Sequence, residues 1–205
     1  MARRTKEEAA ATRDSILDAA EQLFVEQGVS RTTLQHIATA AGVTRGAIYW
    51  HFDDKGALFN AMMERATLPF ECAFSVLECS GGADPLRDMR TFILEIFRVT
   101  EQNPQARRVF EIATLKTEFT EEVDSARVRK REAVAEWRAR MEAQLAEARE
   151  KGQLPASVDP HNAATCMWVM LDGLLRNWLF DLESFDLMAL GGEVIDTFLA
   201  GLKAR

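Results

Sequence analysis

Apolar residues recur every three or four positions along most of this chain, and no stretch alternates between apolar and polar residues for long. This period is typical of amphipathic helices, which prolines and glycines separate from one another. The first helix shows the pattern clearly, with an apolar stripe from Ile16 to Phe24. We therefore predict an all-α fold of about nine helices, at about 6–27, 33–40, 44–51, 55–79, 84–101, 103–115, 120–151, 161–180 and, after Gly191-Gly192, to about 202.

The second and third predicted helices are short and are joined by a tight turn around Gly42. Glycine at this point permits a positive φ, and two short helices around such a turn are typical of a helix-turn-helix motif. Capping fits the same boundaries, since Thr33 and Thr44 precede the two helices. The apolar residues that would pack the pair are Leu34, Ile37, Ala38, Val43 and Ile48.

The third helix carries an unusual run of rings in the segment TRGAIYWHF, residues 44–52. Ile48 and Phe52 are four residues apart and define its buried face. Tyr49 and Trp50 lie about 100° and 200° away from Ile48, so both cannot be buried with it. We expect Tyr49, His51 and, less clearly, Trp50 to face a binding partner; the alternative is that Trp50 belongs to the core.

A recognition helix must offer polar groups to base edges and to phosphates. Arg45 can reach guanine, and the small residues Gly46 and Ala47 would let the helix approach the major groove closely. Tyr49, His51 and Lys55 can donate to phosphate oxygens, and Trp50 can offer its indole N–H and a flat face. The full set of expected DNA-binding residues is Thr33, Thr44, Arg45, Gly46, Ala47, Tyr49, Trp50, His51 and Lys55.

The negative net charge of the whole chain does not exclude a nucleic-acid partner, because the charge is unevenly distributed along the sequence. The net charge is −7, but residues 1–65 hold eight Lys and Arg against nine Asp and Glu, so the acidity lies mainly beyond them. No apolar run is long enough to cross a bilayer, and the charged N-terminus lacks the apolar segment of a signal peptide, so we expect a cytoplasmic protein. The spacing of Cys and His predicts no metal site, and no arrangement predicts an enzyme or a cofactor.

The motifs themselves resemble those of the TetR family of one-component bacterial repressors. The matching segments are TRDSILDAAEQLF (12–24), GVSRTT (28–33), IATAAGVTRGAIYWHF (37–52) and DKGAL (54–58). Further segments resemble the AcrR-like branch of multidrug-efflux repressors, namely ARRTKEEA (2–9), KGQLP (151–155), DGLLRNWLF (172–180) and SFDL (184–187).

This resemblance implies a DNA-binding domain over residues 1–54 and a ligand-binding and dimerisation domain over 55–205. It implies a homodimer on a palindromic DNA operator, released by small lipophilic ligands, that represses a multidrug-efflux operon. The alternatives are a regulator of a catabolic or lipid operon, or a helical ligand-binding protein that does not bind DNA. The chain departs from the family at His36, where an acidic residue is common, and at Asp53. We expect the first change to weaken the cap of its helix or to alter its contact with the third helix.

The C-terminal helices are rich in methionine and aromatic residues, which pack an ordinary core or line a pocket that adapts to different ligands. Asp172 and Arg176 either form a local ion pair or anchor a ligand. The candidate ligand-binding residues are Met89, Phe92, Ile93, Ile96, Glu111, Thr114, Trp137, Met141, Trp168, Asp172, Leu175 and Arg176. The penultimate helix is apolar on more than one face, which favours self-association. The expected dimer interface consists of Met170, Leu174 and Trp178, completed by Val194, Phe198 and Leu202 of the last helix.

Overall fold

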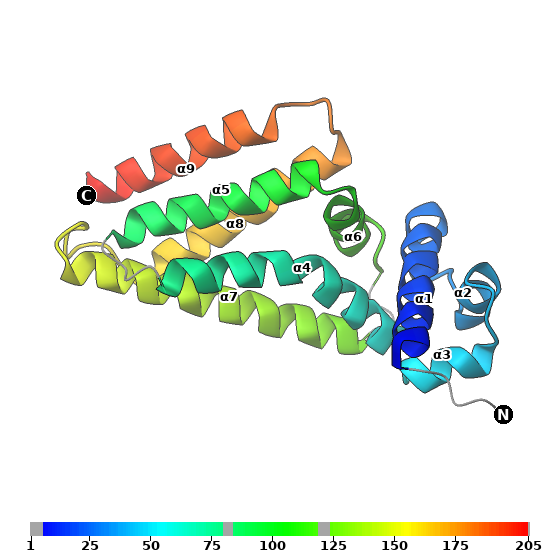
Figure 1. Cartoon of the computed structure of the whole chain (residues 1–205). Coiled ribbons are helices and arrows are strands. Elements are labelled where there is room, and N and C mark those ends of the chain that lie inside the picture. The colour runs from blue at the N-terminus through cyan, green and yellow to red at the C-terminus, as the bar shows by residue number, and fades with distance from the viewer. Residues whose placement is uncertain (1–5, 80–83, 119–123, 205) are drawn as a thin grey trace. The chain divides into compact units, whose positions relative to one another are not determined.

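The computed structural model describes residues 6–79, 84–118 and 124–204, with the backbone alone over 68–79. These residues form nine helices and no strand, which confirms the all-α prediction. The helices are α1 (Lys6–Gln27), α2 (Leu34–Ala40), α3 (Arg45–His51), α4 (Lys55–Cys79), α5 (Pro85–Gln102), α6 (Pro104–Leu115), α7 (Asp124–Glu150), α8 (Pro160–Phe180) and α9 (Leu187–Lys203) (Figure 1).

The chain divides into two compact units that do not follow one another in sequence. The first unit comprises Met1–Ala66 and Arg108–Lys130, and the second comprises Thr67–Arg107 and Arg131–Arg205. Helices α4, α6 and α7 therefore each begin in one unit and end in the other. The predicted functional boundary between residues 54 and 55 stays a prediction. The first compact unit does not end there, because it also includes residues 55–66 and 108–130.

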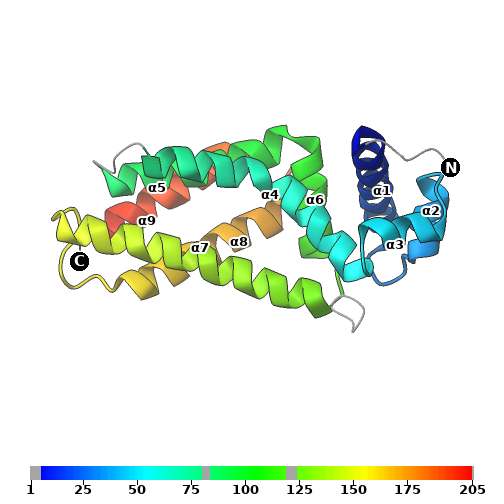
Figure 2. The same ribbon diagram turned by 60° about the horizontal axis from the view of Figure 1, so that its bottom comes forward.

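A single apolar core organises the first unit. Helices α1, α2 and α3 pack against one another, as both views show (Figure 2). Gly42, with φ of +66°, makes the turn between α2 and α3 as predicted. The core residues come from all three helices and from α4, α6 and α7: Ile16, Leu17, Ala20, Phe24, Ile37, Ile48, Phe52, Leu58, Met62, Val109, Ile112 and Ala126.

Helices α5, α8 and α9 dominate the second unit and run alongside one another in both views (Figures 1 and 2). Helix α9 begins at Leu187 with Asp186 as its N-cap, so the prediction that it starts after Gly191-Gly192 was wrong. The two glycines lie inside the helix because α5 approaches closely there. A Cβ atom on Gly191 would lie 2.6 Å from the Phe97 ring. Glycine here marks packing between helices and not a break in the chain.

Candidate nucleic-acid interface and ligand-binding unit

Helix α2 has a complete cap at its N-terminus. The Thr33 Oγ1 accepts a hydrogen bond from the His36 backbone N–H at 3.2 Å, and the His36 Nδ1 accepts one from the Thr33 backbone N–H at 3.4 Å. These two bonds form a capping box in which histidine replaces the usual acidic residue. The His36 imidazole thus accepts in place of a carboxylate, so the cap is present in this structure.

Helix α3 is short and presents its first residues to solvent. Its N-cap Thr44 accepts a hydrogen bond from the Ala47 N–H at 3.2 Å, which places Arg45 in the first turn. Arg45 and Gly46 are exposed, and Ala47 is partly exposed. A Cβ atom on Gly46 would meet only the Thr44 hydroxyl, at 3.9 Å, so packing within the unit does not require glycine at this position.

The rings of α3 divide between core and surface as the helical geometry predicts. Ile48 is fully buried and Phe52 is 4% exposed, whereas Tyr49 is 46% and Trp50 74% exposed. His51 is partly exposed and meets the Trp50 ring edge-on, with centroids 4.6 Å apart. The alternative in which Trp50 belongs to the core was therefore wrong, because its indole lies on the surface.

Arg45 and Tyr49 form a pair on this surface. An Arg45 guanidinium nitrogen donates a hydrogen bond to the Tyr49 hydroxyl at 2.9 Å, and the guanidinium carbon lies 5.5 Å from the centre of the ring. The two residues are four positions apart on α3, a spacing that brings side chains together on a helix. Tyr49 thus holds the guanidinium in a defined direction as well as presenting its own ring.

Lys55 occupies a different place from the phosphate-contacting position that we predicted. Its side chain is 6% exposed, and its ammonium donates hydrogen bonds to the carbonyls of Val29 at 3.1 Å and Thr32 at 3.0 Å. Both acceptors lie in the turn between α1 and α2. In this structure Lys55 therefore ties the start of α4 to that turn.

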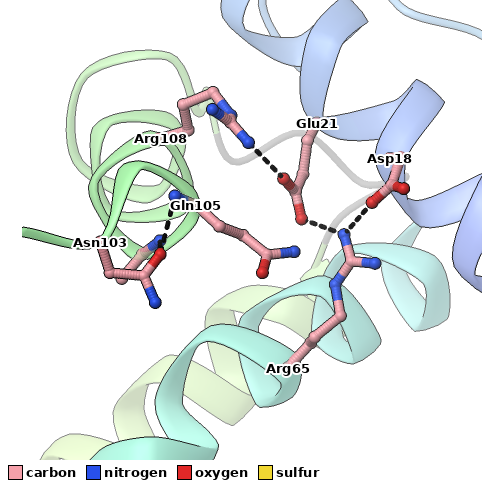
Figure 3. A network of polar contacts seen from close by, with 7 residues as sticks. Asp18, Glu21, Arg65, Asn103, Gln105 and Arg108 are labelled. Carbon is pink, nitrogen blue, oxygen red and sulfur yellow. Dashed lines mark hydrogen bonds and ion pairs between the residues drawn. The ribbon is translucent and has the colours of Figure 1, made fainter. Parts of the chain in front are cut away.

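The first unit also contains a buried carboxylate, that of Glu21, which was not predicted from the sequence. Glu21 is 2% exposed and is paired with Arg65 of α4, which also contacts Asp18 at 2.8 Å (Figure 3). Arg108 of α6 lies 3.8 Å from the second Glu21 oxygen. Burial lowers the pKa of Arg65, but the hydrogen bonds and charges of Glu21 and Asp18 outweigh it and leave that pKa above its ordinary value. The missed signal was position: Glu21 follows Leu17 by four residues and so falls on the buried stripe of α1.

Most candidate ligand-binding residues lie in the second unit. Met89, Ile93 and Met141 are fully buried, and Phe92 and Ile96 are nearly so. The rings of Trp137 on α7 and Trp168 on α8 meet at 5.3 Å in an edge-on contact, so the structure brings this predicted pair together. The other candidates of the second unit, Asp172, Leu175 and Arg176, lie on α8.

Two polar features accompany these residues. The Trp137 Nε1 is buried and finds no hydrogen-bond partner among the described residues, which is unusual for a buried indole. Asp172 and Arg176 lie 3.7 Å apart, the local ion pair that we considered, with both side chains partly exposed. Glu111 and Thr114 belong to the first unit, where Glu111 lies 3.9 Å from Lys116.

The candidate dimerisation residues fall into two groups. Trp178 and Leu202 are buried within the second unit, at 4% and 2% exposure. Met170, Leu174, Val194 and Phe198 are partly exposed. Three of them line an apolar groove of about 350 Å³ on α8 and α9, together with neighbours along α9; its lining is Met170, Leu190, Glu193, Val194, Thr197 and Phe198.

No helix among the described residues is long and apolar enough to span a membrane.

Comparison with known proteins places this geometry in a family. The profile described as bacterial regulatory proteins, tetR family, matches residues 16–62, and that of the MAATS-type transcriptional repressor, C-terminal region, matches residues 84–204. The HTH-type transcriptional regulator TtgR of Pseudomonas putida is 40% identical over 99% of this chain and 97% of its own length.

Solved structures agree with the sequence comparison. NalD, the secondary repressor of the MexAB-OprM multidrug efflux pump in Pseudomonas aeruginosa, is 36% identical with a TM-score of 0.88, covering 97% of this chain and 98% of NalD. SmeT, in its complex with triclosan, is 34% identical to this chain with a TM-score of 0.83, and the match covers 93% of this chain and 91% of SmeT. SmeT is the repressor of the Stenotrophomonas maltophilia multidrug efflux pump SmeDEF. The chain has a helix-turn-helix with an exposed α3 surface, and it matches these relatives along nearly its whole length. It therefore belongs to the TetR family of bacterial transcriptional regulators.

Proposed function

We propose that this protein is a transcriptional repressor of a multidrug-efflux operon, acting in the cytoplasm as a homodimer that lipophilic, drug-like ligands release from a palindromic operator. The observation that carries the DNA-binding part is the exposed surface of α3, with Arg45, Tyr49 and Trp50 outside a helix-turn-helix whose other face is packed. The efflux part is supported by the likeness to NalD and SmeT.

In this proposal α3 enters the major groove with its N-terminal residues foremost. Arg45 donates to guanine O6 and N7, and the Tyr49 hydroxyl holds its guanidinium in position. Gly46, which the packing of the unit does not require, leaves room for the edges of the bases. Phosphates are contacted by Trp50, by His51 and by the N-terminal end of α2 at Thr33.

Dimerisation would use α8 and α9. The groove lined by Met170, Val194 and Phe198 is largely apolar, and a second copy would bury it together with Val169, which is 63% exposed. A two-fold axis through this face fits a palindromic operator, with the two α3 helices about one DNA turn apart, roughly 34–36 Å.

The ligand site is proposed among the methionine and aromatic residues of the second unit. The unpartnered Trp137 Nε1, beside Trp168, supplies a donor that a ligand oxygen can accept from. A ligand that favours a different geometry of the second unit would change the separation of the α3 helices through α4 and α6. The coupling expected of such a device is about 1–3 kcal/mol, or 5–150-fold in operator affinity.

The experiment is selection of DNA duplexes from a random pool, followed by titration of the selected duplex at several salt concentrations. We expect an enriched palindrome and a steep loss of affinity with rising salt, because phosphate contacts release counterions. Arg45→Ala should cost about 1–3 kcal/mol and relax preference at one base position in each half-site. Enrichment of no sequence would refute the proposal.

Triclosan, the ligand of the SmeT complex, is the first probe for release. It should lower operator affinity about 5–150-fold, and Trp137→Phe, which lacks the indole N–H, should weaken its effect. The operon is tested separately, by whether the selected palindrome lies upstream of genes for an efflux pump.

A further inference from the structure

Two points of the first unit are held by both α4 and α6. The first, which we call the Glu21 anchor, consists of the buried Glu21 carboxylate of α1 with Arg65 of α4 and Arg108 of α6 (Figure 3). One carboxylate oxygen pairs with Arg65, and the other lies 3.8 Å from Arg108. Helix α1 is thereby joined to both helices through a single side chain.

The second point, the Val29 anchor, lies just after the C-terminal end of α1. The Val29 backbone N–H donates to the carbonyl of Lys116, the residue after α6, at 3.1 Å. The Val29 carbonyl accepts from the ammonium of Lys55, the first residue of α4, at 3.1 Å. Val29 is fully buried and Lys55 is 6% exposed, so water competes little for these bonds.

The two anchors lie eight residues apart in sequence, on and just beyond one helix. Two fixed points at this separation restrict the tilt of α1, which one point could not do. Hydrogen bonds, such as those of Arg65 and Lys55, are directional, whereas apolar side chains tolerate small displacements. Since α1 packs on both α2 and α3, its orientation determines where the exposed surface of α3 points.

A buried ion pair is weak evidence for stability, because well-packed apolar residues often replace it at no cost. Buried charges are better explained where one arrangement must be selected over others. Among the described residues, Glu21 and Lys55 are the two charged side chains that are buried, and each is part of an anchor. Because both buried charges belong to anchors, their role is better explained as positioning α1 than as stabilising the fold.

We propose that the Glu21 and Val29 anchors orient the helix-turn-helix for its operator, with Glu21, Arg65, Arg108 and Lys55 as positioning residues that do not themselves touch DNA. The proposal rests on the proposed DNA-binding function. It adds which residues hold α1, and with it α3, in the orientation that DNA recognition requires. It replaces the phosphate-contacting role predicted for Lys55. It also identifies the bonds through which α4 and α6 hold the DNA-binding surface.

The test compares the affinity for the selected duplex with that for a scrambled duplex of equal length, using the full chain. The main variant is the double substitution Glu21→Leu with Arg65→Met, which exchanges the ion pair for apolar groups and is expected to fold. We expect its preference for the selected duplex to fall about tenfold, because α3 is misdirected. Affinity for the scrambled duplex should stay within about threefold, since non-specific phosphate contacts tolerate misdirection.

Arg108→Gln provides a second variant, because it removes only the α6 arm and leaves Glu21 paired with Arg65. Its preference should also fall, by less than in the double variant. Arg131→Gln, which removes an exposed arginine of α7, is the matched charge control and should leave the preference unchanged.

Lys55→Met separates positioning from phosphate contact. A phosphate-binding lysine contributes about one unit to the slope of log affinity against log salt. We expect the slope of Lys55→Met to equal that of the wild type while its preference for the selected duplex falls. A slope reduced by about one unit would show that Lys55 binds phosphate and would overturn its role here.

The remaining outcomes are also decisive. If the double variant and Arg108→Gln keep the wild-type preference, or lose both affinities in parallel, the Glu21 anchor is only structural and the proposal fails while the proposed function stands. If the wild type itself does not prefer the selected duplex, the proposed function fails and this inference fails with it.

Discussion

The two units of this protein use their polar residues in opposite ways. In the first unit, charged groups are buried at Glu21 and Lys55, and each holds α1 or the turn that follows it. In the second unit, the described ion pairs lie near the surface, as between Arg90 and Asp196, and apolar side chains fill the core. Directional bonds suit the DNA-binding surface that we propose, which must match DNA in one orientation. A core of methionine and aromatic residues suits the proposed binding of different ligands by the second unit.

The largest loss of stability should follow from removing one partner of the buried pair Glu21–Arg65. Arg65→Met alone takes the guanidinium away from the buried Glu21 carboxylate, to which Arg108 comes no nearer than 3.8 Å, and we expect a loss of about 3–5 kcal/mol in the free energy of unfolding. Urea denaturation followed by circular dichroism measures it. The double substitution with Glu21→Leu should recover most of this loss. Equal stability of the single and double variants would show that the cost comes from lost packing and not from the loss of the Arg65 charge beside Glu21.

A smaller effect is expected where the second unit is packed most closely. Gly191→Ala places a methyl group within 2.6–2.7 Å of the Phe97 ring and should cost about 1–3 kcal/mol, because α5 and α9 must move apart. Gly201→Ala on the same helix meets nothing within 4 Å and should instead stabilise the protein by about 0.5–1 kcal/mol. If both variants shift the thermal midpoint in the same direction, the close contact at Gly191 carries no energetic weight.

The smallest expected effect belongs to the surface pair of the second unit. Arg90 holds Asp196 through two hydrogen bonds, at 2.5 and 2.9 Å, and the bond from Arg90 lowers the pKa of Asp196 below its ordinary value despite partial burial. Because the folded state favours the ionised form, the pair stabilises fully above the ordinary value of 3.8 and loses its contribution as the pH falls below it. Asp196→Asn should cost about 0.2–1 kcal/mol at pH 7.

The check for this pair is unfolding of the wild type and Asp196→Asn across the acid range. Their difference in stability should close as the pH falls through the lowered pKa of Asp196. Glu150→Gln, at the exposed C-terminal end of α7, is the control. A difference that persists unchanged in acid would mean that the carboxylate charge is not what stabilises the contact between α5 and α9.

The sequence predicted most of the fold because the helix signals were local. Thr33 and Thr44 cap helices at the predicted places, and the apolar stripe of α1 is buried as its spacing requires. Gly191 misled the prediction because the reason for a glycine there is the Phe97 ring, which is distant in sequence. A local pattern cannot distinguish a glycine that ends a helix from one that admits a neighbour.

The positions of the candidate site residues were likewise predictable where they depend on local geometry and not where they depend on distant segments. Helical geometry sufficed to place Tyr49 and Trp50 outside the core, since their directions relative to Ile48 are fixed within one helix. It did not suffice for Lys55, whose carbonyl partners belong to another segment of the chain. Trp178 and Leu202 were also predicted from apolar character alone, which does not tell the interior of a unit from a surface between copies.

The way in which the first unit is assembled also has a consequence for its synthesis. Its core takes Val109, Ile112 and Ala126 from segments that lie far beyond the helix-turn-helix in sequence. A ribosome releases these residues only after the whole of α5, which belongs to the other unit. The core of the first unit is therefore completed only by residues made late, although domains commonly fold in the order of their synthesis. A nascent chain that stops before α6 lacks one wall of this core and has nothing to hold α1 from that side.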